Sequence, residues 1–185
     1  MLQSITVKRP DRAIAYEVIG IAAFTAITAI SARITIPMEP VPFTLQPLAV
    51  LLSGLVLGAR GGALSQLLYL ALIGVGLPLD ARMLGTAALL GPTAGYLIGF
   101  VPAAFVTGLL GANRNVVWVR LLAGIAGIAV MYAFGISILA MNRSLDLGAA
   151  WIAGGAPFIV PDIAKAIIAA ALAEGGRALL ARWQS

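Results

Sequence analysis

The sequence predicts an all-α integral membrane protein, a bundle of six transmembrane helices with the N- and C-termini in the cytoplasm. Three observations predict this fold class. Hydrophobic residues make up 61% of the 185 residues and charged residues only 10%, whereas soluble domains carry about 25% charged residues. The apolar residues form runs long enough to cross a bilayer. The Lys and Arg residues concentrate in every second connection between these runs.

A helix needs about 20 apolar residues to cross the hydrocarbon core of roughly 30 Å. Charges, prolines and glycine pairs divide the apolar runs into six predicted spans, at about residues 14–34, 45–57, 63–76, 92–110, 117–140 and 158–180. The second span is short, so we expect it to be tilted or partly shielded by protein. We expect a tight turn from Gly58 to Gly62 and a loop from Asn142 through Trp151.

The positions of the basic residues test this map, because cytoplasmic segments hold most Lys and Arg. With six spans and the N-terminus inside, eight basic residues fall on the inner side: Lys8, Arg9, Arg12, Arg60, Arg114, Arg120, Arg177 and Arg182. The outer connections hold three, namely Arg33, Arg82 and Arg143. Adding or removing one span would scramble this division, so it supports both the number of spans and their orientation. No linker or repeat interrupts the chain, and residues 1–185 are expected to form one domain.

Composition also excludes several function classes. The chain has no cysteine and no histidine, so it lacks thiolate metal sites and the commonest general base. No phosphate-binding loop of the Gly-x-x-x-x-Gly-Lys type occurs, and no carboxylate cluster is placed to hold a metal. The net charge is +5, but the basic residues are scattered singly and form no patch for nucleic acid. We therefore expect neither an enzyme, nor a cofactor or metal site, nor a nucleic-acid-binding protein.

Two charged residues inside the last span break the apolar pattern. Asp162 and Lys165 lie three positions apart, so they share one face of a helix. Charged groups inside a bilayer are costly and tend to be functional. The carboxylate only accepts hydrogen bonds and the ammonium only donates them, so the pair suits a ligand with both N–H donors and a carbonyl acceptor. The alternative is a structural ion pair, or an aspartate favoured by the positive end of the helix dipole.

A proline-rich connection carries the next candidates. Phe43, Thr44 and Gln46 follow Pro40 and Pro42 at the start of the second span. Non-helical backbone at membrane depth survives only where protein or a cavity shelters it. These residues are therefore either part of a ligand site or part of an ordinary exposed turn.

The start of the fourth span holds two more candidates. Thr93 and Tyr96 follow Gly91 and Pro92, and either side chain could reach a ligand, although the residues alone favour the alternative. The alternative is helix initiation by proline, with glycine allowing close helix packing.

The first span carries a small-residue face formed by Ala22, Ala26 and Ala29. Small residues at this spacing let helices approach closely. The face is expected either to pack within the protein or to dock another membrane protein.

Five separated segments, in order along nearly the whole chain, resemble the motifs of the BioY family. They read PFTLQPLAVLL from Pro42, LGARGGALS from Leu57, GLP from Gly76, LGPTAGY from Leu90 and PDIAK from Pro161. The members of that family are biotin-capturing subunits, called S components, of energy-coupling-factor transporters in prokaryotes. The resemblance implies six spans, biotin held near the extracellular side, and high-affinity uptake across the cytoplasmic membrane by a multi-pass protein.

The resemblance also implies roles for single residues. Asp162 and Lys165 would grip the ureido ring of biotin. Phe43, Thr44 and Gln46 would form a lid over the ligand. The pocket wall would include Thr93 and Tyr96.

Partners follow from the same resemblance. The alanine face at Ala22, Ala26 and Ala29 would dock a transmembrane coupling protein, and two ATPase subunits would supply the energy. Residues 79–84 depart from the glycine-rich stretch that many relatives have, and Arg82 in this segment is a candidate for the biotin carboxylate. The alternative function is a stand-alone secondary carrier or channel for biotin or another small solute, although we find no inverted repeat typical of such carriers.

Overall fold

Helices make up most of the chain. The structure is a computed structural model that describes residues 10–183, with side chains over 14–175. Its elements are α1 (Pro10–Ser31), β1 (Thr35–Ile36), β2 (Phe43–Thr44), α2 (Gln46–Gly74), η1 (Gly85–Leu89), α3 (Ala94–Gly111), α4 (Val117–Arg143), α5 (Leu147–Gly154), η2 (Ala156–Phe158) and α6 (Ile159–Trp183). The basic residues Lys8 and Arg9, which entered the orientation count, lie outside the described residues. So do the side chains of Arg12, Arg177 and Arg182.

Five helical stretches of the described residues are long and apolar enough to cross a membrane. They cover Ile14–Ser31, Gln46–Gly74, Ala94–Gly111, Val117–Arg143 and Leu147–Gly175. Large apolar side chains such as Val75, Leu90 and Met141 remain more than three-quarters exposed on the outside of the bundle. Water disfavours such a surface and lipid does not, so the described fold is that of a membrane protein.

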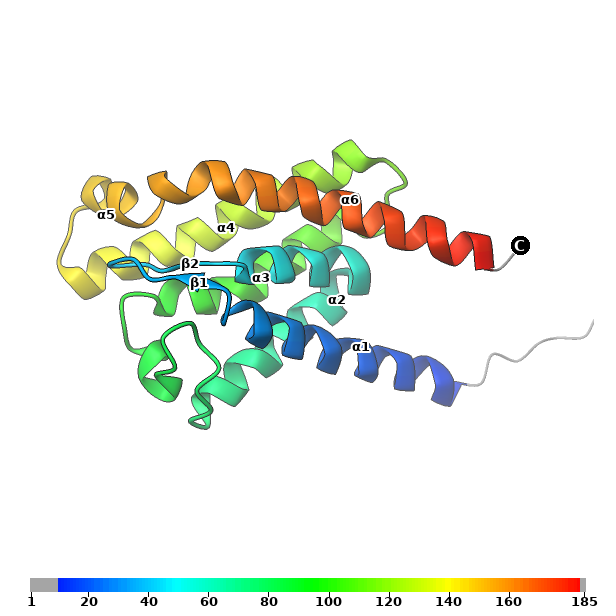
Figure 1. Cartoon of the computed structure of the whole chain (residues 1–185), viewed down its shortest axis with the longest axis horizontal. Coiled ribbons are helices and arrows are strands. Elements are labelled where there is room, and N and C mark those ends of the chain that lie inside the picture. Colours follow the sequence, from blue (N-terminus) through cyan, green and yellow to red (C-terminus); the bar gives the residue numbers. More distant parts are fainter. Residues whose placement is uncertain (1–9, 184–185) are drawn as a thin grey trace, which may run out of the picture.

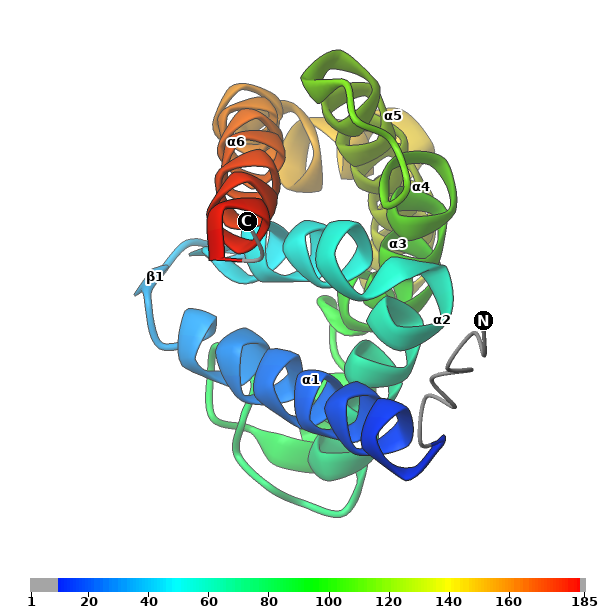
Figure 2. The same ribbon diagram turned by 90° about the vertical axis from the view of Figure 1, so that its right-hand side faces the viewer.

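The predicted second and third spans lie in one helix, α2, which is broken at a single residue. Gly58 has φ 79° and ψ 179°, outside the helical region, and only glycine adopts this conformation readily. Figure 2 shows the two arms of α2 meeting at an angle. The predicted turn from Gly58 to Gly62 was too long, because helix resumes directly after Gly58. Gly62 serves packing instead, since a Cβ there would lie 2.7 Å from the Gly54 Cα.

The predicted loop from Asn142 through Trp151 was also partly wrong. Residues 147–154 form the short helix α5. Its N-cap is Asp146, whose Oδ1 accepts a hydrogen bond from the Ala149 N–H at 2.9 Å. An aspartate followed by apolar residues is a helix-start signal, which was outweighed by the nearby charges and by Gly154 and Gly155.

The long helices α1, α4 and α6 run along the length of the molecule (Figure 1). The described ends of α1 and α6 lie at one end, and α5 with the two short strands lies at the other. Helix α3 packs against α2 on one side and α4 on the other, while α6 contacts both α2 and α4. Residues at the beginnings of α2, α3 and α6 and in the middle of α4 line one cavity.

The buried face of α1 is not its alanine face. Thr25 and Thr28 are buried against α2, and their hydroxyls donate to the Ser65 carbonyl at 2.9 Å and to Gln66 Oε1 at 3.3 Å. Ala22 and Ala26 are exposed and Ala29 is half-buried. The exposed alanines are thus available to an external partner, and their docking role stays a prediction.

Candidate ligand-binding site

The two charged residues lie at the beginning of α6, near the beginnings of α2 and α3. Asp162 lies in the first turn, and the Lys165 Nζ donates to its Oδ1 at 2.7 Å. Their side chains are only 4% and 5% exposed. The spacing of three residues thus does bring the groups together on one helix face, as predicted. Burial makes either charge costly without the other.

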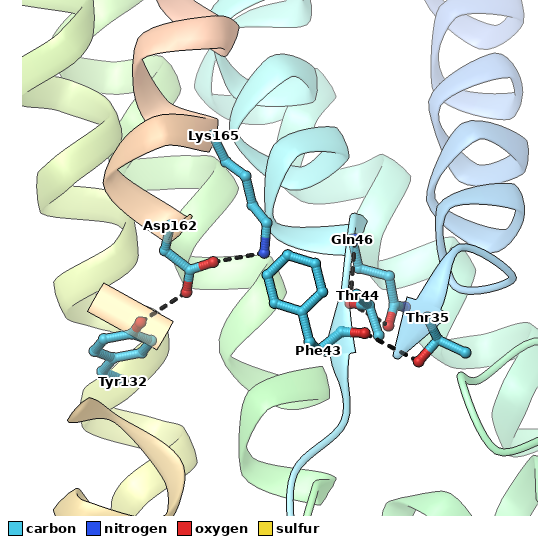
Figure 3. A network of polar contacts seen from close by, with 7 residues as sticks. All are labelled: Thr35, Phe43, Thr44, Gln46, Tyr132, Asp162 and Lys165. Carbon is cyan, nitrogen blue, oxygen red and sulfur yellow. Dashed lines mark hydrogen bonds and ion pairs between the residues drawn. The ribbon is translucent and has the colours of Figure 1, made fainter. Parts of the chain in front are cut away.

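A third residue completes this cluster. The Tyr132 hydroxyl on α4 donates to the second carboxylate oxygen, Asp162 Oδ2, at 2.7 Å (Figure 3). The edge of its ring meets Trp151 of α5, with ring centroids 6.0 Å apart and an interplanar angle of 75°. Tyr132 was not singled out from the sequence. Its one signal is a hydroxyl in the middle of a long apolar span, which does not identify its partner 30 residues away.

The short hairpin β1–β2 brings an aromatic ring to the lysine. The Lys165 Nζ lies 4.1 Å from the centroid of the Phe43 ring, within the range of a cation–π contact (Figure 3). The strands pair antiparallel, with Thr35 opposite Thr44 and Ile36 opposite Phe43. The Thr35 hydroxyl also donates to the Phe43 carbonyl at 3.0 Å. This hairpin, which the sequence did not predict, fixes Phe43 over the ammonium.

The polar residues after Phe43 are held by bonds within the protein. The Gln46 N–H donates to the Thr44 Oγ1 at 3.2 Å, and the Gln46 Nε2 donates to the Tyr69 hydroxyl at 2.7 Å. Tyr69 in turn donates to the Leu79 carbonyl at 3.0 Å. These contacts tie the start of α2 to its far arm and to the loop that follows. They also hold the Gln46 side chain in place, with the amide oxygen close to the Thr44 hydroxyl.

A cavity that is partly open to solvent connects these residues. Among the sequence-predicted site residues, seven line it: Thr44, Gln46, Arg82, Thr93, Tyr96, Asp162 and Lys165. Phe43 is not part of the wall but contacts Lys165, which is. The structure thus brings together all eight predicted ligand residues, and their role in binding stays a prediction.

Tyr96 contributes its ring to the cavity wall and its hydroxyl to the fold. The hydroxyl donates to the Gly154 carbonyl at 2.9 Å, which joins α3 to the end of α5. A Cβ on Gly135 would lie 2.2 Å from the Tyr96 ring. Glycine at position 135 therefore makes room for the ring.

Arg82 lies at the rim of the cavity. Its guanidinium donates to the Pro40 carbonyl at 2.9 Å and the Met38 carbonyl at 3.2 Å, and pairs with Glu39 at 3.0 Å. The buried carboxylate of Asp80 shapes the same loop by accepting from the backbone N–H of Arg82 at 3.0 Å. Asp80 lines the cavity but was not among the predicted site residues.

The oppositely charged Asp162 and Lys165 line the cavity together with apolar residues such as Phe100 and Met131. One carboxylate, one ammonium and one phenol converge there, with acceptor and donor side by side. Among the described residues, no group of three or more His, Cys, Asp or Glu side chains is placed to hold a metal ion. This chemistry suits an uncharged ring that carries N–H donors and a carbonyl acceptor.

The fold and this site define a class of protein, a helical membrane protein with a partly open, mainly apolar pocket that contains a buried ion pair. The chain belongs to the BioY family, whose profile matches residues 4–182.

Individual relatives agree with this membership. The chain is 44% identical over 161 residues to the probable biotin transporter BioY of Pyrococcus horikoshii, covering 86% of this chain and 95% of the relative. It is 40% identical over 158 residues to the biotin transporter BioY of Thermotoga maritima, covering 85% and 93%. A crystal structure of the S-component for biotin from an ECF-type ABC transporter superposes with a TM-score of 0.81 at 26% identity. That match covers 90% of this chain and 93% of the other.

Proposed function

We propose that this chain captures biotin with high affinity and takes it across the cytoplasmic membrane as the S component of an energy-coupling-factor transporter. The observation that carries the proposal is the buried Asp162–Lys165 pair in the lining of a partly open cavity. The names of the relatives supply the ligand. The relatives' names describe transporters, not enzymes. The sequence also contains no histidine and no cysteine, two residue types that are common in catalysis.

The pair is chemically complementary to the ureido group of biotin, which has N–H donors and a carbonyl acceptor. A ureido N–H donates to the Asp162 carboxylate, and the Lys165 ammonium donates to the ureido oxygen. The sulfur-containing ring packs on the apolar wall, which includes Phe100 and Met131. The valerate chain leads toward the rim, where Arg82 is the cation for its carboxylate.

The proposed topology keeps six crossings with both termini in the cytoplasm. The two arms of α2 on either side of Gly58 serve as the second and third spans. Each is shorter than the roughly 30 Å hydrocarbon core at 1.5 Å per residue, so they depend on neighbouring helices for shelter. Helix α1 then begins at the cytoplasmic end of the molecule (Figure 1), and the cavity beside the start of α6 lies toward the extracellular side.

The proposed partners follow from the exposed side of α1. Ala22 and Ala26 present a smooth surface, suited to a helix of a transmembrane coupling protein. Two ATPase subunits on that protein would supply the energy, since we find no phosphate-binding loop in the sequence of this chain. Membrane lipids cover the remaining apolar surface.

Binding and uptake of radiolabelled biotin test the function directly. The purified protein is expected to bind biotin at micromolar concentrations or below. Vesicles that contain the chain together with its coupling protein and ATPase subunits are expected to accumulate biotin when ATP is present inside. Failure to bind biotin would remove the assignment. Equal accumulation by the chain alone would instead favour the stand-alone carrier.

A further inference from the structure

Both oxygens of the Asp162 carboxylate already have partners within the protein. Oδ1 accepts from the Lys165 Nζ and Oδ2 accepts from the Tyr132 hydroxyl, each at 2.7 Å. The three residues are between 3% and 8% exposed, so water competes little for these bonds. A carboxylate offers about four acceptor positions. Two therefore remain for N–H groups of a ligand, in directions that the existing bonds define.

The two partners differ in how firmly they hold the carboxylate. Lys165 is on the same helix as Asp162 and has a long, flexible side chain. Tyr132 comes from a different helix, α4, and its ring is held edge-on against Trp151. A tyrosine ring has two rotatable bonds, so this contact leaves the hydroxyl little freedom. Tyr132 is thus the more rigid reference point for the carboxylate.

We propose that Tyr132 is a positioning residue for ligand recognition, which holds the Asp162 carboxylate in the orientation that receives the ligand N–H. The inference rests on the proposed function and assigns part of its selectivity to α4. A pre-oriented acceptor loses less conformational freedom when the ligand arrives, which strengthens binding. Trp151 contributes through Tyr132 by keeping its ring in place.

The test removes only the hydroxyl. Tyr132→Phe is expected to weaken biotin binding about 10-fold, in line with loss of a hydrogen bond to a charged group. Tyr16→Phe is the matched control, because Tyr16 is 72% exposed on α1, away from the cavity, and it is expected to bind like the native protein. Trp151→Ala leaves the hydroxyl but frees the ring, and is expected to weaken binding in the same direction by a smaller factor.

A double-mutant cycle separates positioning from a general effect on the fold. In an Asp162→Ala background there is no carboxylate to orient. There, Tyr132→Phe is expected to change biotin affinity less than about 2-fold. Melting temperatures of the ligand-free variants confirm that each is folded.

Three results would overturn the inference. One is native affinity in Tyr132→Phe, another is the same loss with and without the Asp162 carboxylate, and the third is native affinity in Trp151→Ala. If the native protein itself binds no biotin, the proposed function fails. If native protein binds and Asp162→Ala weakens binding while Tyr132→Phe does not, only the role of Tyr132 fails.

Discussion

The Asp162 carboxylate is bonded both by a residue of its own helix and by a residue far away in the sequence. Asp162 and Lys165 are three residues apart, and helix geometry alone places their side chains in contact, as the 2.7 Å bond confirms. Tyr132 meets the same carboxylate from 30 residues away. That contact depends on how α4 packs on α6, which no local pattern in one sequence specifies. The Asp162–Lys165 contact was therefore predictable from the sequence, whereas the Tyr132–Asp162 contact was not.

Arg82 carries a prediction about the far end of the ligand. If its guanidinium receives the biotin carboxylate, Arg82→Gln is expected to weaken biotin binding by about 1 kcal/mol, because the site is partly exposed and solvent screens the charge. Binding of biotin methyl ester is expected to stay unchanged by the substitution, and calorimetry on both ligands provides the measurement. An equal loss for acid and ester would show that Arg82 stabilises the loop through its bonds to Met38 and Pro40 and does not bind the carboxylate.

At the scale of elements, α3, α4 and α6 begin within two residues of the predicted spans, because charges, glycines and prolines mark their ends clearly. α2 and α5 differ from prediction for physical reasons. A single glycine suffices to break α2, where a whole turn was expected. The Asp146 cap starts a helix in a segment whose polar residues favoured a loop.

Gly58 is expected to be required for the kink in α2. Gly58→Ala places a side chain at φ 79° and should lower the free energy of unfolding by about 1–3 kcal/mol. Gly175→Ala is the control, since Gly175 lies in α6, where a Cβ meets nothing within 4 Å. That change should be neutral or stabilise by about 0.5–1 kcal/mol. Thermal unfolding in detergent measures both, and equal stability of the two variants would contradict this role of the kink.

At the scale of the whole molecule, composition was the strongest predictor. An apolar chain with few charges led to a helical membrane fold, and five described stretches are long and apolar enough to cross. The cavity was not predictable in detail, because its lining combines residues from six parts of the chain. The resemblance to a family named eight candidate ligand residues, and seven of them line the cavity.

The exposed alanines of α1 carry the prediction at this scale. Replacing Ala22 and Ala26 by leucine is expected to reduce ATP-dependent biotin uptake at least about 10-fold, because bulky residues block close helix approach. Biotin binding to the purified chain is expected to stay native, since both residues lie away from the cavity lining. Uptake by cells that express the full transporter supplies the readout. Normal uptake with both leucines in place would show that the coupling protein docks on another surface.

Calorimetric titration with biotin tests most directly whether Asp162 and Lys165 hold the ureido ring. Asp162→Asn and Lys165→Ala are each expected to lose at least about 2 kcal/mol of binding free energy, because each change leaves a buried charge without its partner. Glu17→Gln, on the exposed side of α1, is the control and should bind like the native protein. Unchanged affinity in both site variants would contradict the account.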